Sequence, residues 1–171
     1  GNVKIGVVSP VIWHDSRDGH WLIPGVDWTL LNVGVIAPTN LDSGSLLLGP
    51  GVKLDEPIKA LIRRESLQPG KNICFMFGFQ AEPTPLDTNN LSRIIALQKE
   101  FPGFDFGFMD HSLGVSEDAL NLPLMALGTG IRCIEKHMTL DPLLKMEDSI
   151  SALPPSKFKE FVRIIRKYEP A

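Results

Sequence analysis

The chain has 171 residues, of which 43% are hydrophobic and 22% charged, and its formal net charge is −3. That composition excludes a disordered or collagen-like chain, and the length favours a single domain. Because there is neither a basic excess nor an apolar run of about 18 residues, we expect no nucleic-acid groove and no membrane span. Cys74 and Cys133 lie in apolar runs, as reduced, buried thiols do, which predicts a cytoplasmic protein.

Short apolar segments predict strands, and most of them are almost wholly apolar rather than alternating. This pattern is typical of parallel strands that are buried on both faces and covered by helices. In chain order, the predicted strands are Lys4–Ser9, Trp28–Ile36, Ser45–Gly49, Ile73–Phe79, Phe104–Met109 and Ile131–Glu135. Residues 10–25 and 37–44 are rich in Pro, Gly, Asp and Ser and predict loops.

Longer segments with apolar residues three and four positions apart predict amphipathic helices. They are Asp55–Ser66, Asn89–Glu100, Ser116–Leu127 and Ser156–Tyr168. Pro123 lies inside the third segment and should kink that helix or mark its true first turn. The alternation of strands and helices indicates right-handed βα units around a parallel sheet. Two architectures fit this order, a doubly wound sheet and part of a (β/α)₈ barrel.

Polar side chains follow or end three successive predicted strands. They are Gln80, Glu82, Asp110, His111, Glu135, Lys136 and His137. Because the carboxyl ends of parallel strands meet at one edge of a sheet, we expect these residues to share one rim. Two neutral imidazoles at the ends of adjacent strands can bind one divalent metal, so His111 and His137 are candidate ligands. The plainer interpretations are hydrogen-bonded structural histidines and a salt-bridged Lys136.

Three motifs occur here in a fixed order: Gln80-Ala81-Glu82-Pro83-Thr84-Pro85, Asp110-His111-Ser112-Leu113-Gly114 and Glu135-Lys136-His137-Met138-Thr139-Leu140-Asp141. In these motifs the chain resembles the sialic acid synthase (N-acetylneuraminate synthase) family. The resemblance implies a partial TIM (β/α)₈ barrel, about strands three to eight, with a parallel sheet and helices outside. Residues 1–171 would then form one incomplete barrel domain, without the antifreeze-like C-terminal domain that bacterial members usually have.

The resemblance also implies an activity in carbohydrate biosynthesis. Family members are transferases that condense phosphoenolpyruvate with an N-acylated amino sugar, such as N-acetylmannosamine, and use a divalent metal, Mn²⁺ or Mg²⁺. By position, His111 and His137 match the metal ligands of the family. The candidate catalytic residues are Asp148, Glu135 and Lys136, and the candidate substrate-binding residues are Gln80, Thr84 and Asp110.

Several positions depart from the family pattern. Gly49 and Met109 stand where phosphate-binding serines are usual, Glu82 stands where a tyrosine is common, and Trp28–Ile36 lacks a lysine and a glutamate of the family's fourth strand. A carboxylate near a phosphate is electrostatically unfavourable. We therefore expect little condensation by these residues alone.

A second hypothesis therefore stays open, a degenerate, non-catalytic barrel that retains metal or carbohydrate binding. A third is an unrelated metal-dependent aldolase or isomerase. Without the family's first two strands, the sheet would have an open edge at Lys4–Ser9. That edge predicts a homodimer or a cover formed by residues 10–25.

Overall fold

The computed structural model describes residues 4–8, 20–22, 29–32, 35–36, 55–64, 66–70, 73–141, 143 and 148–169. The strands are β1 (Lys4–Val8), β2 (His20–Leu22), β3 (Thr29–Asn32), β4 (Val35–Ile36), β5 (Ile73–Phe77), β6 (Phe79–Gln80), β7 (Asp105–Asp110) and β8 (Cys133–His137). The helices are α1 (Asp55–Arg64), α2 (Ser92–Glu100), α3 (Asp118–Leu127) and α4 (Pro155–Tyr168), with short 3₁₀ helices η2 (Leu86–Thr88) and η4 (Ser149–Ser151). All of the predicted helices are confirmed, with slightly different ends.

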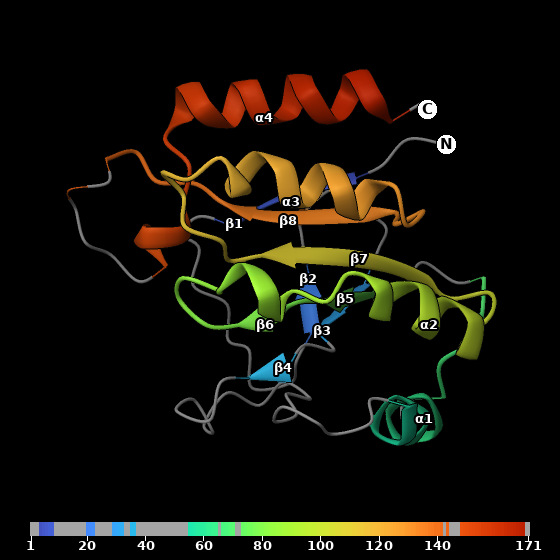
Figure 1. The fold of residues 1–171 in the computed structure, drawn as a ribbon. Helices are drawn as coiled ribbons and strands as arrows, with labels where there is room; N and C mark the ends of the chain where they lie inside the picture. Colours follow the sequence, from blue (N-terminus) through green and yellow to red (C-terminus); the bar gives the residue numbers. More distant parts are fainter. Residues whose placement is uncertain are drawn as a thin grey trace.

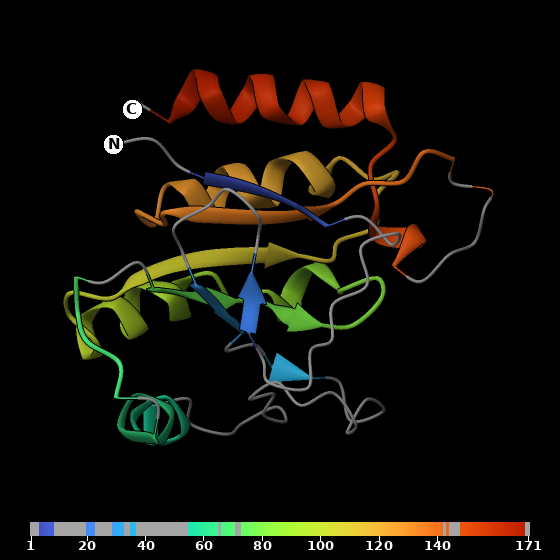
Figure 2. The same cartoon turned by 180° about the vertical axis from the view of Figure 1, so that it is seen from behind.

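Six strands form the main sheet, in the order β1-β8-β7-β5-β3-β2. Every neighbouring pair is parallel except β2 and β3, which are antiparallel. Helices α2 and α3 lie on one face of this sheet in Figure 1, and the view from behind in Figure 2 brings the strands to the front. A doubly wound sheet would carry helices on both faces. Parallel strands with helices on one outer face are the arrangement of a barrel wall.

The two faces of β7 and β8 contribute to two different clusters of buried side chains. Phe108 and Ile134 belong to the larger cluster, together with side chains of the surrounding helices such as Phe161. Met109 and Cys133 belong to a smaller cluster with side chains of β5. Because successive residues of a strand point to opposite faces, the larger cluster is the sheet–helix core and the smaller one lies on the inner face.

Helix α4 shows how the sequence pattern produces this core. Pro155 occupies its first turn, where a missing N–H costs nothing, and Phe161 and Ile165 on its inner stripe are fully buried. Helix α3 begins at Asp118, five positions before Pro123, so the proline does not mark its first turn. A proline therefore coincides with the start of α4 but lies inside α3, whose extent follows its apolar periodicity.

Strand β1 does not take the place of a third barrel strand. It pairs in parallel with β8, with Lys4 opposite Cys133 and Val8 opposite His137. In a closed barrel the last strand lies between the seventh and the first, so β1 occupies the position of a first strand. Among the described residues, β1 has a strand neighbour on one side only. The predicted homodimer or cover at this edge stays a prediction.

Three other expectations about strands are revised. Trp28–Ile36, predicted as one strand, gives β3 and β4, which belong to different sheets. The predicted strand Ile73–Phe79 is broken at Gly78, where a Cβ atom would collide with the carbonyl oxygen of Met109. The predicted loop over residues 10–25 contains β2, which gains its hydrogen bonds from β3 rather than from a pattern of its own. The strand predicted at Ser45–Gly49, which includes Gly49, and the loop at 37–44 lie outside the described residues.

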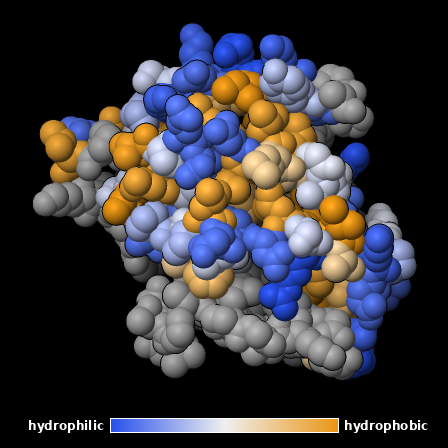
Figure 3. Space-filling model, viewed as in Figure 1, coloured by the Kyte–Doolittle hydropathy of each residue, from blue (hydrophilic) through white to orange (hydrophobic). Residues whose placement is uncertain are grey.

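The surface over the helices mixes polar and apolar side chains, as Figure 3 shows in blue and orange. Exposed apolar residues in the described part of the chain include Val115, Met125 and Ile150. Val115 and Ile150 line one mainly apolar pocket together with Leu113 and Pro154, whereas single exposed apolar side chains are ordinary for a protein surface. Across the described residues, no helix has the length and hydropathy that crossing a membrane requires.

Candidate metal centre

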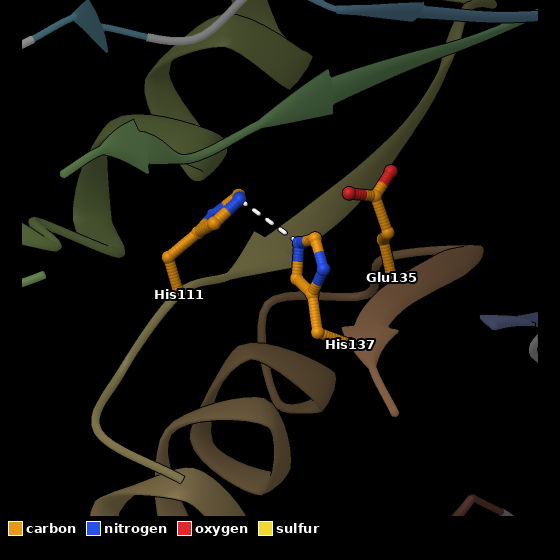
Figure 4. A group of neighbouring side chains, drawn as sticks. All are labelled: His111, Glu135 and His137. Carbon is orange, nitrogen blue, oxygen red and sulfur yellow. Dashed lines mark hydrogen bonds between the residues drawn. The ribbon is translucent and has the colours of Figure 1, made fainter. Parts of the chain in front are cut away.

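Two histidines and a glutamate converge at the carboxyl ends of β7 and β8. His111 directly follows β7, and Glu135 and His137 lie two residues apart on β8, which places them on the same face of the strand. The Nε2 atoms of the two imidazoles are 3.1 Å apart. The ligand atoms of all three side chains lie within 4.8 Å of one another, and Figure 4 shows the rings turned toward each other with the carboxylate beside them.

These three residues fit a divalent metal ion. Two nitrogens bound at about 2.1 Å and at right angles to one ion are about 3.0 Å apart, close to the distance between the facing Nε2 atoms. The Nδ1 atom of His111 is buried and has no hydrogen-bond partner, while its Nε2 atom shares a hydrogen bond with Nε2 of His137 that a metal ion would replace. Two imidazoles and a carboxylate form a donor set suited to Mn²⁺ and to other first-row divalent metals.

Burial sets the charge of the cluster. It lowers the pKa of His111 to about 4 and the pKa of His137 well below its usual value, with the charge of His111 as the second cause for His137. Burial also raises the pKa of Glu135 to about 7. At neutral pH the imidazoles are therefore neutral, which leaves their lone pairs available to a metal, and Glu135 lies near its midpoint of protonation.

Two segments far apart in sequence hold the histidine backbones. The carbonyl oxygen of His111 accepts hydrogen bonds of 2.8 Å from the N–H of Thr84 and from the hydroxyl of Ser151. The carbonyl oxygen of His137 accepts a bond of 3.0 Å from the N–H of Leu153. The loop before η2 and the segment around η4 therefore both anchor the centre.

Asp148 comes to the centre from the start of η4. Its Oδ2 atom lies 3.5 Å from the Nδ1 atom of His137. Asp148 has a left-handed backbone, with φ of 60°, and burial raises the pKa of its carboxyl. A carboxylate beside the second ring nitrogen of a metal-binding histidine orients the ring and fixes its tautomer.

The structure does not bring every predicted site residue into this cluster. Lys136 lies between Glu135 and His137 on β8, so its side chain points to the opposite face. Its Nζ atom is 2.7 Å from Oδ2 of Asp110, and both side chains are fully buried. Burial lowers the pKa of the Lys136 ammonium, and the Asp110 carboxylate opposes that shift.

Two predicted substrate-binding residues, Gln80 and Thr84, lie before η2. The Thr84 hydroxyl donates hydrogen bonds to the carbonyl oxygens of Phe79 and Ala81, at 2.7 and 2.9 Å, and so holds its own loop. Gln80 lies in β6 opposite Ile36, and its side chain is outside the described part of the structure. Both assignments stay predictions.

Sequence reasoning assigned Glu135 to catalysis and did not place it with the two histidines as a candidate metal ligand. The signal was present, because Glu135 and His137 are two residues apart in a strand and must share a face. The anchoring contacts of Thr84 and Ser151 had no such signal, since Ser151 is 40 positions from His111.

Comparison with known proteins supports the same architecture. A model described as the NeuB family matches residues 29–171. The pseudaminic acid synthase of Campylobacter jejuni is 30% identical over 125 residues, which cover 73% of this chain and 35% of that protein. The chain thus spans about a third of the length of this curated relative.

Two solved structures are similar in fold. The spore coat polysaccharide biosynthesis protein SpsE of Bacillus subtilis matches with a TM-score of 0.58 and 34% identity, over 71% of this chain and 33% of that chain. The N-acetylneuraminic acid synthetase of Leptospira borgpetersenii matches with a TM-score of 0.59 and 20% identity, over 82% of this chain and 41% of that one. The predicted partial (β/α)₈ barrel is confirmed.

Proposed function

Because the chain belongs to the NeuB family, we propose that it forms part of a sugar-acid synthase that condenses phosphoenolpyruvate with an N-acylated amino sugar of the N-acetylmannosamine type. The name of the Campylobacter jejuni relative, a pseudaminic acid synthase, supports the biosynthesis of a sugar acid. The single observation that carries the proposal is the buried cluster of His111, Glu135 and His137 at the strand ends. We assign this chemistry to the cytoplasm, since both cysteines are buried as thiols.

His111 and His137, with Glu135 beside them, would hold the divalent ion, Mn²⁺ or Mg²⁺. When bound, such an ion supplies Lewis-acid polarisation of the aldehyde of the open-chain sugar. The two imidazoles enter the centre neutral, because burial lowers their pKa values. No proton has to leave them before they bind a metal.

Glu135 and Asp148 are the acid–base groups of the proposal. In the metal-free chain burial raises the pKa of Glu135 to about 7, so Glu135 can act as a general acid or base only if it lies beside the ion and does not bind it. Asp148 lies 3.5 Å from His137 and is partly exposed, so its carboxylate can orient the imidazole and reach a bound sugar. Gln80 and Thr84 remain the proposed contacts on the phosphoenolpyruvate side.

A specific observation favours the second candidate, a barrel that binds metal or carbohydrate without condensing substrates. Glu82 is exposed, and Met109 is buried among sulfur-containing side chains, at two positions where the family has groups for phosphate binding. A phosphate needs cationic or hydroxyl partners, and charge-assisted bonds are roughly twice as strong as neutral ones. The two candidates share the metal centre and differ in the condensation.

The experiment measures manganese binding by calorimetry and phosphate release with phosphoenolpyruvate and N-acetylmannosamine. We expect manganese binding that His111→Ala abolishes, and low phosphate release by this chain. Phosphate release that requires the sugar, the metal and His111 supports the synthase. Metal binding with no sugar-dependent release supports the second candidate, and a chain that binds no manganese contradicts both.

A further inference from the structure

An ion pair lies behind the metal centre, on the face of the sheet that packs against the helices. The Nζ atom of Lys136 and the Oδ2 atom of Asp110 are 2.7 Å apart, and neither side chain is exposed. The two residues are also register partners on β7 and β8. Each immediately precedes one histidine of the centre, so the pair joins the two backbone points from which His111 and His137 project.

The Asp110 carboxylate also holds the backbone on the far side of His111. Its second oxygen, Oδ1, accepts a hydrogen bond of 2.8 Å from the backbone N–H of Ser112. The carboxylate therefore spans His111, with the Lys136 ammonium at one oxygen and the following amide at the other. A bond from an Asp side chain to the amide two residues on fixes the local backbone as a turn.

Stability alone does not account for this buried pair. Replacing a buried ion pair by apolar side chains of similar volume is often neutral or stabilising, because two charges no longer have to leave water. Phe108 and Ile134, on the same face of β7 and β8, belong to an apolar core in which such side chains pack. A shift of one residue in the register of two paired strands turns every side chain to the other face. An ion pair such as Asp110 and Lys136 can form in one register only, and it therefore opposes that shift.

We propose that Asp110 and Lys136 are a positioning pair that sets the approach of His111 to His137. The proposal rests on the metal centre of the proposed function, but it concerns a geometry that the metal-free chain already has. The facing ring nitrogens are 3.1 Å apart and the ring centroids 4.8 Å apart. Asp110 and Lys136 act through the backbone of the histidines and contact neither metal nor substrate.

The test replaces both members of the pair at once, so that no buried charge loses its partner. Asp110→Leu with Lys136→Met is the apolar variant, and Asp110→Asn with Lys136→Met is the amide variant, which keeps an acceptor for the N–H of Ser112. The first readout is the nuclear Overhauser effect between the ring protons of His111 and His137 in the metal-free chain. We expect it in the wild type and expect its loss in the apolar variant. The second readout is manganese affinity, which we expect to fall about 10-fold or more.

The exposed pair at the other end of the same two strands provides the matched control. Asp105 and Arg132 are 4.0 Å apart with side chains 39% and 48% exposed. Asp105→Leu with Arg132→Met should leave both the ring contact and the manganese affinity at wild-type values. A change of the same size in this control would assign the effect to strand pairing in general and overturn the proposal.

The outcomes separate this inference from the proposed function. A folded apolar variant that keeps the ring contact and the wild-type affinity overturns the positioning role, as does a wild type without the ring contact. If the apolar variant does not fold, the amide variant decides by the same two readouts. A wild type that shows the contact but binds no manganese contradicts the proposed function, and the ring contact alone then decides the positioning role.

Discussion

Strands β7 and β8 are joined by an ion pair near each end, and the two pairs differ in distance and burial. At the amino end, Arg132 and Asp105 are 4.0 Å apart and well exposed. At the carboxyl end, Lys136 and Asp110 are 2.7 Å apart and fully buried. An exposed pair contributes about 0–1 kcal/mol, because water and salt screen it. A buried pair carries a desolvation cost that only its own partner offsets.

The difference shows at which end of the strands this fold buries charged groups despite their desolvation cost. The exposed pair lies at the end of the strands away from the histidines, and its removal should matter little. The buried pair lies at the end that carries His111, Glu135 and His137, all of them buried and with pKa values that burial displaces. The groups that are expensive to bury are thus gathered where parallel α/β folds carry their sites.

The largest expected effect comes from removing one member of the buried pair. Lys136→Met leaves the Asp110 carboxylate buried without its partner, so the free energy of unfolding should fall by about 3–5 kcal/mol. The matched change in the exposed pair, Arg132→Met, should alter it by about 1 kcal/mol or less. Urea denaturation followed by circular dichroism measures both. Equal losses for the two variants would remove the distinction between the two ends of the strands.

The next effect concerns the metal rather than the fold. His137→Ala removes one of the two facing nitrogens, and manganese affinity should fall by about 100-fold or more, beyond the 10–100-fold typical of groups that only orient a ligand. Calorimetry measures this loss. His20→Ala is the control, because His20 lies in β2 at the opposite edge of the sheet from the β1–β8 pair. An unchanged affinity in His137→Ala would refute the metal centre.

A smaller effect is expected from the carboxylate that orients His137. Asp148→Asn removes the charge 3.5 Å from Nδ1 of His137, so manganese affinity should fall about 10-fold while the fold is retained. Asp141→Asn is the matched control, since Asp141 is exposed and its carboxylate accepts a bond from the N–H of Leu143. Equal affinities of the two variants would show that Asp148 does not orient the ring.

The helices and strands could largely be predicted from the sequence, but the pairing of the strands mostly could not. Apolar periodicity predicted the helices and the buried strands, because both depend on residues close in sequence. It could not identify β8 as the partner of Lys4–Val8, since a short apolar strand fits any open edge. It also predicted a loop where β2 forms, because the hydrogen bonds of His20–Leu22 come from β3.

The site was predictable where strand geometry alone decides it. The histidines were found because they end adjacent parallel strands. Treating all polar strand-end residues as one rim placed Lys136 and Asp110 there too, although alternation along β8 already separates Lys136 from its neighbours. The hydrogen bonds of Thr84 and Ser151 to the His111 carbonyl depend on the folded path of the chain. No spacing in the sequence encodes them.

A further expected effect is a change in how the stability of the metal-free chain depends on pH. Between pH 4.5 and 7, Glu135 binds a proton in the folded chain that the unfolded chain has released, so this group makes stability fall as pH rises. Between pH 4 and 6.5, the unfolded chain binds a proton at His111 that the folded chain does not, so stability rises with pH. His137, whose pKa is also lowered, acts in the same direction as His111.

From pH 4.5 to 6.5, Glu135 therefore opposes the two histidines and flattens the profile. Glu135→Gln removes the opposition, and the free energy of unfolding should then rise with pH more steeply than in the wild type, by about 1.4 kcal/mol per pH unit. Urea denaturation across this range measures the slope, with the surface substitution Glu117→Gln as the control. Parallel profiles for the wild type and Glu135→Gln would mean that Glu135 is ionised in the folded chain. The carboxylate would then face the metal position already charged, and its role would be that of a ligand rather than of an acid.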